Sequence, residues 1–378
     1  MLVCVPWYAP ARGFGGGIVT AVMATVRGAL EAGHDVTVAT TDLLDFQSRI
    51  PPDAPAEPAG AQVLRFPNLS HRLAAANAPF PRGLRLWLGE HAGEFDVVLL
   101  QDVYTSVSVL GARAAVRARV PYVLQAYGML PASRERGRAA VKRAFLALWG
   151  RRTVREAAAC LYLSKSERDE YLAQGADPAR LHLVPPSLDI ASSDNIPRSS
   201  APSVVYLGRL HPIKRVDVLL EAFARVRVEL PDARLDVIGA PSAHGEELRA
   251  RAGDGVDFRG LIPEQEKARA LSSAHVFALL SASEGLPITP LEALACGTPV
   301  VLSPGCGLPQ VDGVAGIVCD GSAESAAEAL LALLRDPERA RRLGEAGRAL
   351  AAGYRREKIV PDLVGLLERL ATSSSSAA

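Results

Sequence analysis

Short apolar runs alternate with segments of helical periodicity from the first residues onward. Residues 2–5 are apolar throughout and predict a buried strand. A glycine-rich stretch follows, and then apolar positions recur every three or four residues, as on one face of a helix. Gly33 is placed to end this helix, and 36–39 predicts a second strand. This βαβ opening predicts a parallel sheet with a right-handed crossover. The apolar helix positions are Ile18, Val22, Met23, Val26 and Leu30.

The same alternation restarts after a polar stretch rich in serine and proline at 191–203, which predicts a linker. We expect a Rossmann-like domain at 1–190 and a second at 204–354, then a helix at 355–372 that packs back on the first domain, and a disordered tail at 373–378. Further strands are expected at 63–66, 97–100, 122–125, 160–163, 181–184, 204–207, 235–238, 276–280, 299–302 and 316–318, and further helices at 216–230, 323–334, 337–352 and 358–370.

Composition narrows the class of protein. Hydrophobic residues make up 49% of the chain and aromatic ones 5%, so the cores are expected to be aliphatic. The net charge of +1 argues against a nucleic-acid partner, because proteins that bind nucleic acids usually carry an excess of basic residues. The five cysteines are scattered and form no CxxC pair, which argues against a disulfide framework or a zinc site. We expect a cytoplasmic protein without a signal peptide or a transmembrane helix.

Glycines at 13 and 15–17 stand between the first strand and the first helix. Glycines here let a ligand approach the backbone, and a helix N-terminus offers free N–H groups to an anion, so Gly16 and Gly17 are candidate residues for binding an anionic ligand. The dinucleotide fingerprint GxGxxG is not met. Asp42 nevertheless follows the second strand, where a ribose-binding acid would lie, so an NAD-dependent oxidoreductase stays an alternative. A plain tight turn is the other interpretation.

Two charged clusters follow predicted strands of the second domain. Arg209 and Lys214 come after the strand at 204–207, where α/β folds bind ligands, and both side chains suit phosphate. Glu284 and Glu292 flank a predicted helix start, and carboxylates accept hydrogen bonds from sugar hydroxyls. Backbone N–H groups between them suit a diphosphate, which adds Gly285, Leu286, Pro287 and Ile288 as candidates. A solvated turn is the alternative for the first cluster, and a Thr289–Glu292 capping box for the second glutamate.

In combination and in order these motifs resemble glycosyltransferase family 4. The resemblance is strongest over 204–318: YLGRL at 206–210, then Lys214, LLEAF at 219–223, an E-x7-E pair at 284–292, and EALACGTPVV at 292–301. The N-terminal half matches more loosely, through the glycines at 15–17 and GHDVTV at 33–38.

The resemblance implies a GT-B fold of two Rossmann-like domains with a cleft between them, and a retaining transferase that uses a nucleotide-sugar donor. It implies that Arg209 and Lys214 clamp the diphosphate, that Glu292 binds the ribose, and that Glu284 lies beside the transferred sugar. Asp102 and Tyr127 are assigned to the acceptor and sugar side. The chain departs from the family at Tyr127, where histidine is common, at Pro186-Ser187, where Asn-Gly is common, and at Pro287, where glycine is usual.

The chain contains no Asp-x-Asp, HExxH or GxSxG motif. We therefore expect no cofactor and no metal, with the nucleotide sugar as a substrate and a glycan or lipid-linked molecule as acceptor. By family analogy the role is polysaccharide or glycolipid biosynthesis. A sugar-nucleotide epimerase or a phosphorylase of the same fold remains an alternative.

Residues 132–157 combine eight arginines and lysines with interleaved apolar residues, among them Phe145, Leu148 and Trp149. This pattern predicts a basic amphipathic helix that could lie on the inner face of a membrane as a peripheral contact. The alternative is that the apolar residues face the core of the domain and the arginines face solvent.

Overall fold

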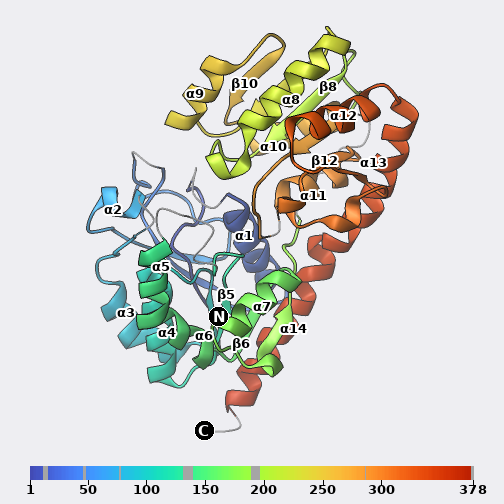
Figure 1. Cartoon of the computed structure of the whole chain (residues 1–378). Helices are drawn as coiled ribbons and strands as arrows, with labels where there is room; N and C mark the ends of the chain where they lie inside the picture. The colour runs from blue at the N-terminus through green and yellow to red at the C-terminus, as the bar shows by residue number, and fades with distance from the viewer. Residues whose placement is uncertain are drawn as a thin grey trace. The chain divides into compact units, whose positions relative to one another are not determined.

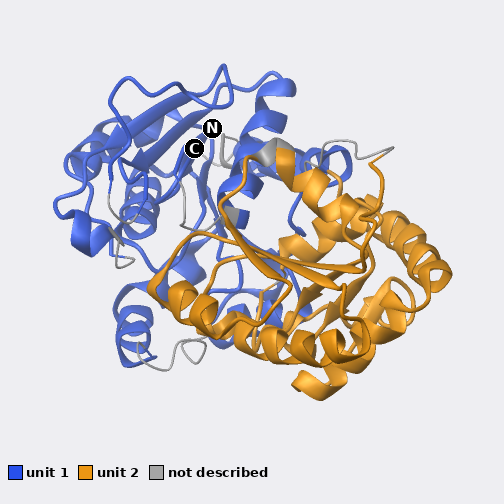
Figure 2. Ribbon diagram, turned by 90° about the horizontal axis from the view of Figure 1, so that it is seen from above, with its two compact units in different colours: residues 1–187, 356–378 blue, residues 188–355 orange. Residues whose placement is uncertain are grey.

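The computed structural model describes residues 1–11, 16–45, 48–75, 78–130, 139–188, 196–285 and 287–375. The chain divides into two compact units, residues 1–187 with 356–378 and residues 188–355 (Figure 2). The first unit is therefore built from both ends of the chain.

The first unit contains a seven-stranded parallel sheet with the order β3-β2-β1-β4-β5-β6-β7. The order reverses between the neighbours β1 and β4, as in doubly wound nucleotide-binding folds. The strands are β1 (Leu2–Cys4), β2 (Thr37–Thr41), β3 (Gln62–Phe66), β4 (Val98–Leu100), β5 (Tyr122–Gln125), β6 (Ala159–Tyr162) and β7 (Leu181–Leu183).

Helices cover both faces of this sheet, because successive strand residues point to opposite faces and both faces are apolar. Val3 packs in a core with side chains of α1 and α14, whereas Leu2 and Cys4 pack in another with side chains of α3 and α4. The helices of this unit are α1 (Gly16–Glu31), α2 (His71–Ala75), α3 (Leu84–His91), α4 (Ser106–Ala118), α5 (Ala139–Phe145), α6 (Arg151–Glu156), α7 (Lys165–Ala173) and α14 (Arg356–Ser375), with a π-helical segment at Leu146–Gly150 (Figure 1).

Helix α14 lies against α1. A Cβ atom placed on Gly28 would lie 1.9 Å from Cγ1 of Val360, so only glycine allows this crossing. Arg356, the first residue of α14, bonds Glu31, the last residue of α1, at 2.6 Å, and His34, just beyond α1, contacts Glu368 of α14 at 2.9 Å.

The second unit contains a six-stranded parallel sheet with the order β10-β9-β8-β11-β12-β13. Its order reverses between β8 and β11. The strands are β8 (Ser203–Leu207), β9 (Arg234–Ile238), β10 (Val256–Gly260), β11 (Val276–Leu279), β12 (Val300–Leu302) and β13 (Gly316–Val318); the helices are α8 (Val216–Glu229), α9 (Ala243–Arg251), α10 (Glu264–Ser273), α11 (Ile288–Ala295), α12 (Ala323–Leu334) and α13 (Pro337–Ala351).

The expected elements are present, with shifts at their ends. The predicted cap at Gly33 is confirmed: its φ is +88°, and the amides of Gly33 and His34 bond back to Leu30 and Ala29. Helix α14 runs to Ser375, so the expectation of a disordered tail was wrong for 373–375. Residues 376–378, like residues 191–195 of the predicted linker, lie outside the described residues. The sequence pattern missed β10, an edge strand in which only Phe258 is buried.

Candidate functional site

The second sheet presents a switch point between β8 and β11. From the carboxyl end of β8 the chain leads to β9 on one side of the sheet, and from that of β11 it leads to β12 on the other side. The two loops therefore run in opposite directions. Ligands of open α/β sheets bind in the crevice that such divergence creates. Both charged clusters of the sequence, 209–214 and 284–292, begin at this edge.

The loop after β8 is held by its own hydrogen bonds. The hydroxyl of Tyr206 donates to the carbonyl of Arg209 at 2.8 Å. The Nδ1 atom of His211 accepts the amide of Ile213 at 3.2 Å and opens a short 3-10 helix that ends at Lys214. The side chain of Arg209 is exposed, and the described part of the chain offers it no hydrogen-bond or ion-pair partner. It is therefore available to an anion.

Lys214 and Glu284 form a largely buried ion pair. Nζ of Lys214 lies 2.5 Å from Oε1 of Glu284, and the two side chains are 14% and 13% exposed. The amide of Ala282 donates to the carbonyl of Ile213 at 2.8 Å, which joins the two loops through their backbones. The structure thus brings the first cluster and the first glutamate of the motif together.

Gly305 supports Glu284 from the loop after β12. Its carbonyl accepts the amide of Glu284 at 2.8 Å. A Cβ atom on Gly305 would lie 2.3 Å from the carbonyl oxygen of Ser281, so a side chain would push this loop away. Sequence reasoning missed Gly305, since an isolated glycine among many carries no distinctive signal.

Glu292 does not take part in a capping box, and that alternative was wrong. Helix α11 begins at Ile288 with Pro287 as its N-cap and no side-chain capping bond, so Glu292 lies in the second turn rather than the first. Its Oε1 atom instead accepts a hydrogen bond from Nζ of Lys267 at 2.7 Å. The side chains of Lys267 and Glu292 are 15% and 6% exposed.

Sequence reasoning missed Lys267, because a single lysine in the amphipathic α10 has no local pattern to distinguish it. Of the remaining donor candidates, Gly285 and Pro287 lead into α11, whose first residue is Ile288. Leu286 lies outside the described residues.

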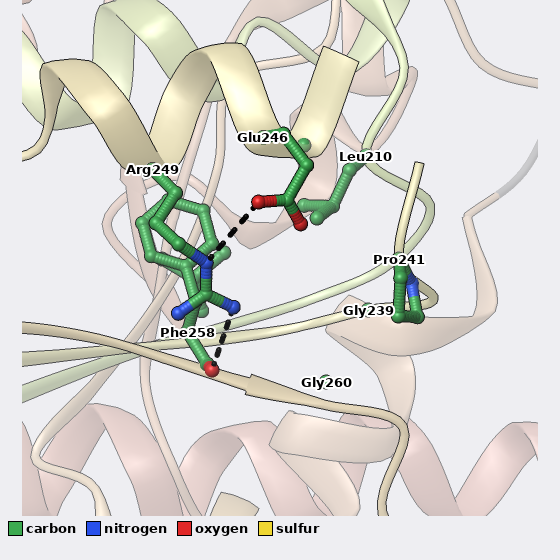
Figure 3. Close-up of a pocket in the computed structure, with 9 residues that line it drawn as sticks. Leu210, Gly239, Pro241, Glu246, Arg249, Phe258 and Gly260 are labelled. Atoms are coloured by element: carbon green, nitrogen blue, oxygen red, sulfur yellow. Dashed lines mark hydrogen bonds and ion pairs between the residues drawn. The ribbon is translucent and has the colours of Figure 1, made fainter. Parts of the chain in front are cut away.

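A small pocket lies beside the same edge of the second sheet (Figure 3). It has a volume of about 230 Å³ including its open mouth, and it is lined by residues of β9, β10 and α9 and of the loops after β8 and β9. Arg249 lies over the ring of Phe258 at 5.0 Å and donates to the Phe258 carbonyl at 3.2 Å. Glu246 contacts the same guanidinium at 4.0 Å. The pocket is lined by Leu210, Val237, Gly239, Pro241, Gly245, Glu246, Arg249, Phe258 and Gly260.

The first unit places its candidates at the carboxyl ends of β1, β4 and β5. Gly16 and Gly17 are the first residues of α1, and residues 12–15 before them are outside the described residues. Asp102 follows β4 and is 1% exposed; its Oδ1 accepts the amide of Tyr104 at 3.1 Å. Desolvation raises the pKa of Asp102, and the hydrogen bonds to its carboxylate partly oppose this effect.

Tyr127 is held in a left-handed backbone conformation, with φ +51°. Such a conformation costs about 1–3 kcal/mol and persists only where neighbours impose it. Here Tyr171 of α7 accepts the amide of Ala126 at 2.8 Å, and Glu167 of the same helix accepts the amide of Gly128. The phenol of Tyr127 is thereby placed 2.5 Å from Oε1 of Gln101, to which it donates.

Burial raises the pKa of Tyr127 far above its usual value, and the nearby Glu167 carboxylate adds to this rise. The phenol therefore remains a neutral donor. Gln101 and Glu167 were not predicted, because they meet Tyr127 only through the order of β4, β5 and β6 in the sheet.

Both carboxylate oxygens of Asp42 accept hydrogen bonds from neighbouring residues. Its Oδ2 accepts from Arg49 at 2.6 Å, and its Oδ1 accepts from the amide and the side chain of Asn68 at 2.9 and 3.0 Å. These bonds tie the end of β2 to the chain after β3. The geometry gives Asp42 a structural role and does not favour the oxidoreductase alternative.

Two protein families match the sequence. Glycosyl transferases group 1 matches residues 191–350, and the glycosyl transferase 4-like domain matches residues 16–187. The D-inositol 3-phosphate glycosyltransferase of Mycolicibacterium vanbaalenii is 30% identical over 364 residues, which cover 84% of this chain and 77% of that protein. A GDP-mannose-dependent monoacylated alpha-(1-6)-phosphatidylinositol monomannoside mannosyltransferase of Corynebacterium glutamicum is 33% identical over 48% of this chain and 50% of that protein.

Several curated relatives are thus matched over about half their length, among them the D-inositol 3-phosphate glycosyltransferase of Segniliparus rotundus, with 35% identity over 47% of this chain and 44% of that protein. Among solved structures, HepE of Anabaena in complex with UDP and glucose has a TM-score of 0.76 at 17% identity, covering 97% of this chain and 99% of that one. WaaG, a glycosyltransferase involved in lipopolysaccharide biosynthesis, has a TM-score of 0.71 at 19% identity, covering 97% and 99%. The chain therefore belongs to the glycosyl transferases of group 1 and has their GT-B fold.

Proposed function

We propose that the protein is a retaining glycosyltransferase that transfers a sugar from a nucleotide-diphosphate sugar to a hydroxyl acceptor. The observation that carries this proposal is the pairing of Lys214 with Glu284 at the switch point of the second sheet. A cation suited to phosphate and a carboxylate suited to sugar hydroxyls stand side by side there, next to the exposed Arg209. A nucleotide-diphosphate sugar carries an anionic diphosphate next to a sugar with hydroxyl groups. It therefore offers one group to the lysine and the other to the glutamate.

The donor is assigned to the second unit. Arg209, Lys214 and the N-terminus of α11 bind the diphosphate, since guanidinium, ammonium and free N–H groups all stabilise anionic oxygens. Glu284 accepts hydrogen bonds from the transferred sugar and Glu292 from the ribose.

The proposed reaction needs no protein nucleophile. The bond between the anomeric carbon and the diphosphate oxygen breaks, and the negative charge that develops on that oxygen is stabilised by Arg209 and Lys214. The acceptor hydroxyl forms the new bond on the same face of the sugar, and its proton passes to the departing phosphate oxygen. Retention of the anomeric configuration follows from this front-face substitution.

The acceptor is assigned to the first unit. Asp102, which follows β4, and Tyr127, which follows β5, are the candidate contacts on that side. The matched relatives are named for acceptors that carry inositol, either as a phosphate or in a phospholipid. These names support a role in polysaccharide or glycolipid biosynthesis.

A surface of the first unit favours contact with a lipid acceptor. Val141, Leu148 and Trp149, in α5 and the π-helical segment, are 70%, 64% and 38% exposed, so these side chains do not fill the core. The side chains of Arg143, Arg151, Arg152 and Arg155 are exposed in the same stretch. Exposed apolar side chains with arginines around them suit an anionic leaflet, where each basic residue contributes about 1 kcal/mol.

Residues 131–138, which include the start of the predicted basic segment, lie outside the described residues. Among the helices described, none is both long and apolar enough to cross a bilayer. We propose a peripheral contact on the cytoplasmic leaflet.

Thermal-shift measurements with UDP, GDP, ADP and NAD test the donor class. We expect at least one nucleoside diphosphate to raise the melting temperature and NAD to leave it unchanged. Incubation with the matching nucleotide sugar and a panel of hydroxyl acceptors, followed by NMR of the anomeric proton, then tests transfer and retention. Stabilisation by NAD alone, an inverted product, or epimerisation of the sugar without transfer would each contradict the proposal.

A further inference from the structure

Each glutamate of the E-x7-E motif is paired with a lysine from another element. Glu284 contacts Lys214, and Glu292, inside α11, contacts Lys267 of α10. Building on the function proposed above, we propose that Lys267 is a positioning residue of the donor site. It holds the carboxylate of Glu292 oriented for the ribose hydroxyls, and so sets the preference for ribonucleotide donors.

The burial of the pair points to a role beyond stability. The side chains of Lys267 and Glu292 are 15% and 6% exposed, so both charges are largely removed from water. In such a pair the attraction between the charges roughly offsets the free energy lost when both leave water. Proteins with apolar residues of similar size in their place are often as stable. A buried carboxylate does need a partner of opposite charge beside it, because an unpaired charge inside a protein is strongly unfavourable.

The geometry of the hydrogen bond also fixes orientation. Nζ of Lys267 bonds Oε1 of Glu292 at 2.7 Å, which is the short distance of a charge-assisted bond. A carboxylate has two oxygens and about four lone pairs, so one held oxygen leaves the other to accept from a ligand. Ribose carries two adjacent hydroxyls and therefore gains from an acceptor held in a fixed orientation, whereas a sugar without them does not.

The test compares a ribonucleoside diphosphate with its 2′,3′-dideoxy counterpart. The full chain is titrated by calorimetry with whichever of UDP, GDP or ADP binds best, and then with the dideoxy form of the same nucleotide. We expect the wild type to prefer the ribonucleotide by about tenfold or more, the scale of a hydrogen bond to a charged group. In Lys267→Met the two nucleotides are expected to bind with about equal affinity, because the affinity for the ribonucleotide falls while that for the dideoxy form changes little.

A double-mutant cycle separates positioning from a general effect on folding. If Lys267 acts through Glu292, then Lys267→Met combined with Glu292→Gln loses no more ribonucleotide affinity than Glu292→Gln alone. Lys267→Arg, which keeps the charge, is expected to keep a preference for the ribonucleotide. Should Lys267→Met fail to fold, as judged by circular dichroism, Lys267→Gln takes its place in the same cycle.

An unchanged preference in the folded Lys267 variant would overturn the inference, as would additive losses in the double variant. These outcomes differ from a failure of the proposed function. If the wild type bound no nucleoside diphosphate, the donor site itself would be wrong. If it bound one with equal affinity for both sugars, only the assignment of Lys267 and Glu292 to the ribose would fall.

Discussion

Lys214 and Glu284 meet on the two sides of a strand-order reversal, with Nζ 2.5 Å from Oε1 although 70 residues separate them in the chain. Lys214 follows β8 and Glu284 follows β11, so the pair spans the two central strands of the second sheet. A lysine ammonium is a compact charge with three donors and can serve a carboxylate and a phosphate together. This contact places the cation and the carboxylate side by side at the switch point.

Replacing the donor cations is expected to reduce transfer strongly. Lys214→Ala and Arg209→Ala should each lower kcat/KM, and the loss of transition-state stabilisation calculated from it should be about 2–4 kcal/mol. The reason is that a charge-assisted partner of the leaving diphosphate is lost. Steady-state kinetics at several donor concentrations measures the effect. Arg225→Ala removes an exposed arginine on α8 that pairs only with Glu221 among the interactions the structure gives it, so it serves as the control. Wild-type rates in both site variants would rule out the clamp.

Removal of divalent metal is expected to leave activity unchanged. The leaving group is assigned to Arg209, Lys214 and the N-terminus of α11, so the mechanism includes no metal. Initial rates are measured after dialysis against EDTA and again after addition of Mg²⁺ or Mn²⁺. A strict requirement for either ion would contradict this assignment.

Binding to anionic liposomes is expected to depend on the exposed segment of the first unit. Trp149→Ser with Leu148→Ser should weaken co-sedimentation, because less apolar surface is buried in the interface. Raising the salt concentration should weaken it as well. Leu86→Ser, at a 65% exposed leucine on α3, is the matched control and should bind like the wild type. The surface proposal fails if the wild type does not bind at low salt.

The contact between α1 and α14 is expected to tolerate no side chain at Gly28. Gly28→Ala should destabilise the protein by about 1–3 kcal/mol, since the added methyl group overlaps Val360. Val360→Ala in the same chain provides room and should recover part of the loss. Thermal melts compare these variants with Gly89→Ala, where nothing lies within 4 Å of the added Cβ and helix propensity favours alanine. Equal melting temperatures for the two single variants would show that the helices do not pack as described.

The sequence alone determined the features that depend on local order. Apolar periodicity repeats within a few residues, so it indicated the βα alternation of both Rossmann-like units and matched the bounds of α12. The cap at Gly33 also follows from its neighbours, since a left-handed residue after a helix requires only local geometry. The motif at 284–292 pointed to family 4, and the two family matches bear that out.

Only the tertiary structure decided which side chains meet. Thr289 to Glu292 has the pattern of a capping box, yet α11 begins at Ile288, so Glu292 lies in its second turn and its carboxylate bonds Lys267 of α10. Gln101 reaches Tyr127 because β4 and β5 are neighbours in the sheet. The sequence pattern did not predict β10, because an edge strand buries few side chains and so needs few apolar residues. Such contacts join residues far apart in the chain, and their partners are set by strand order and helix packing rather than by any pattern within one segment.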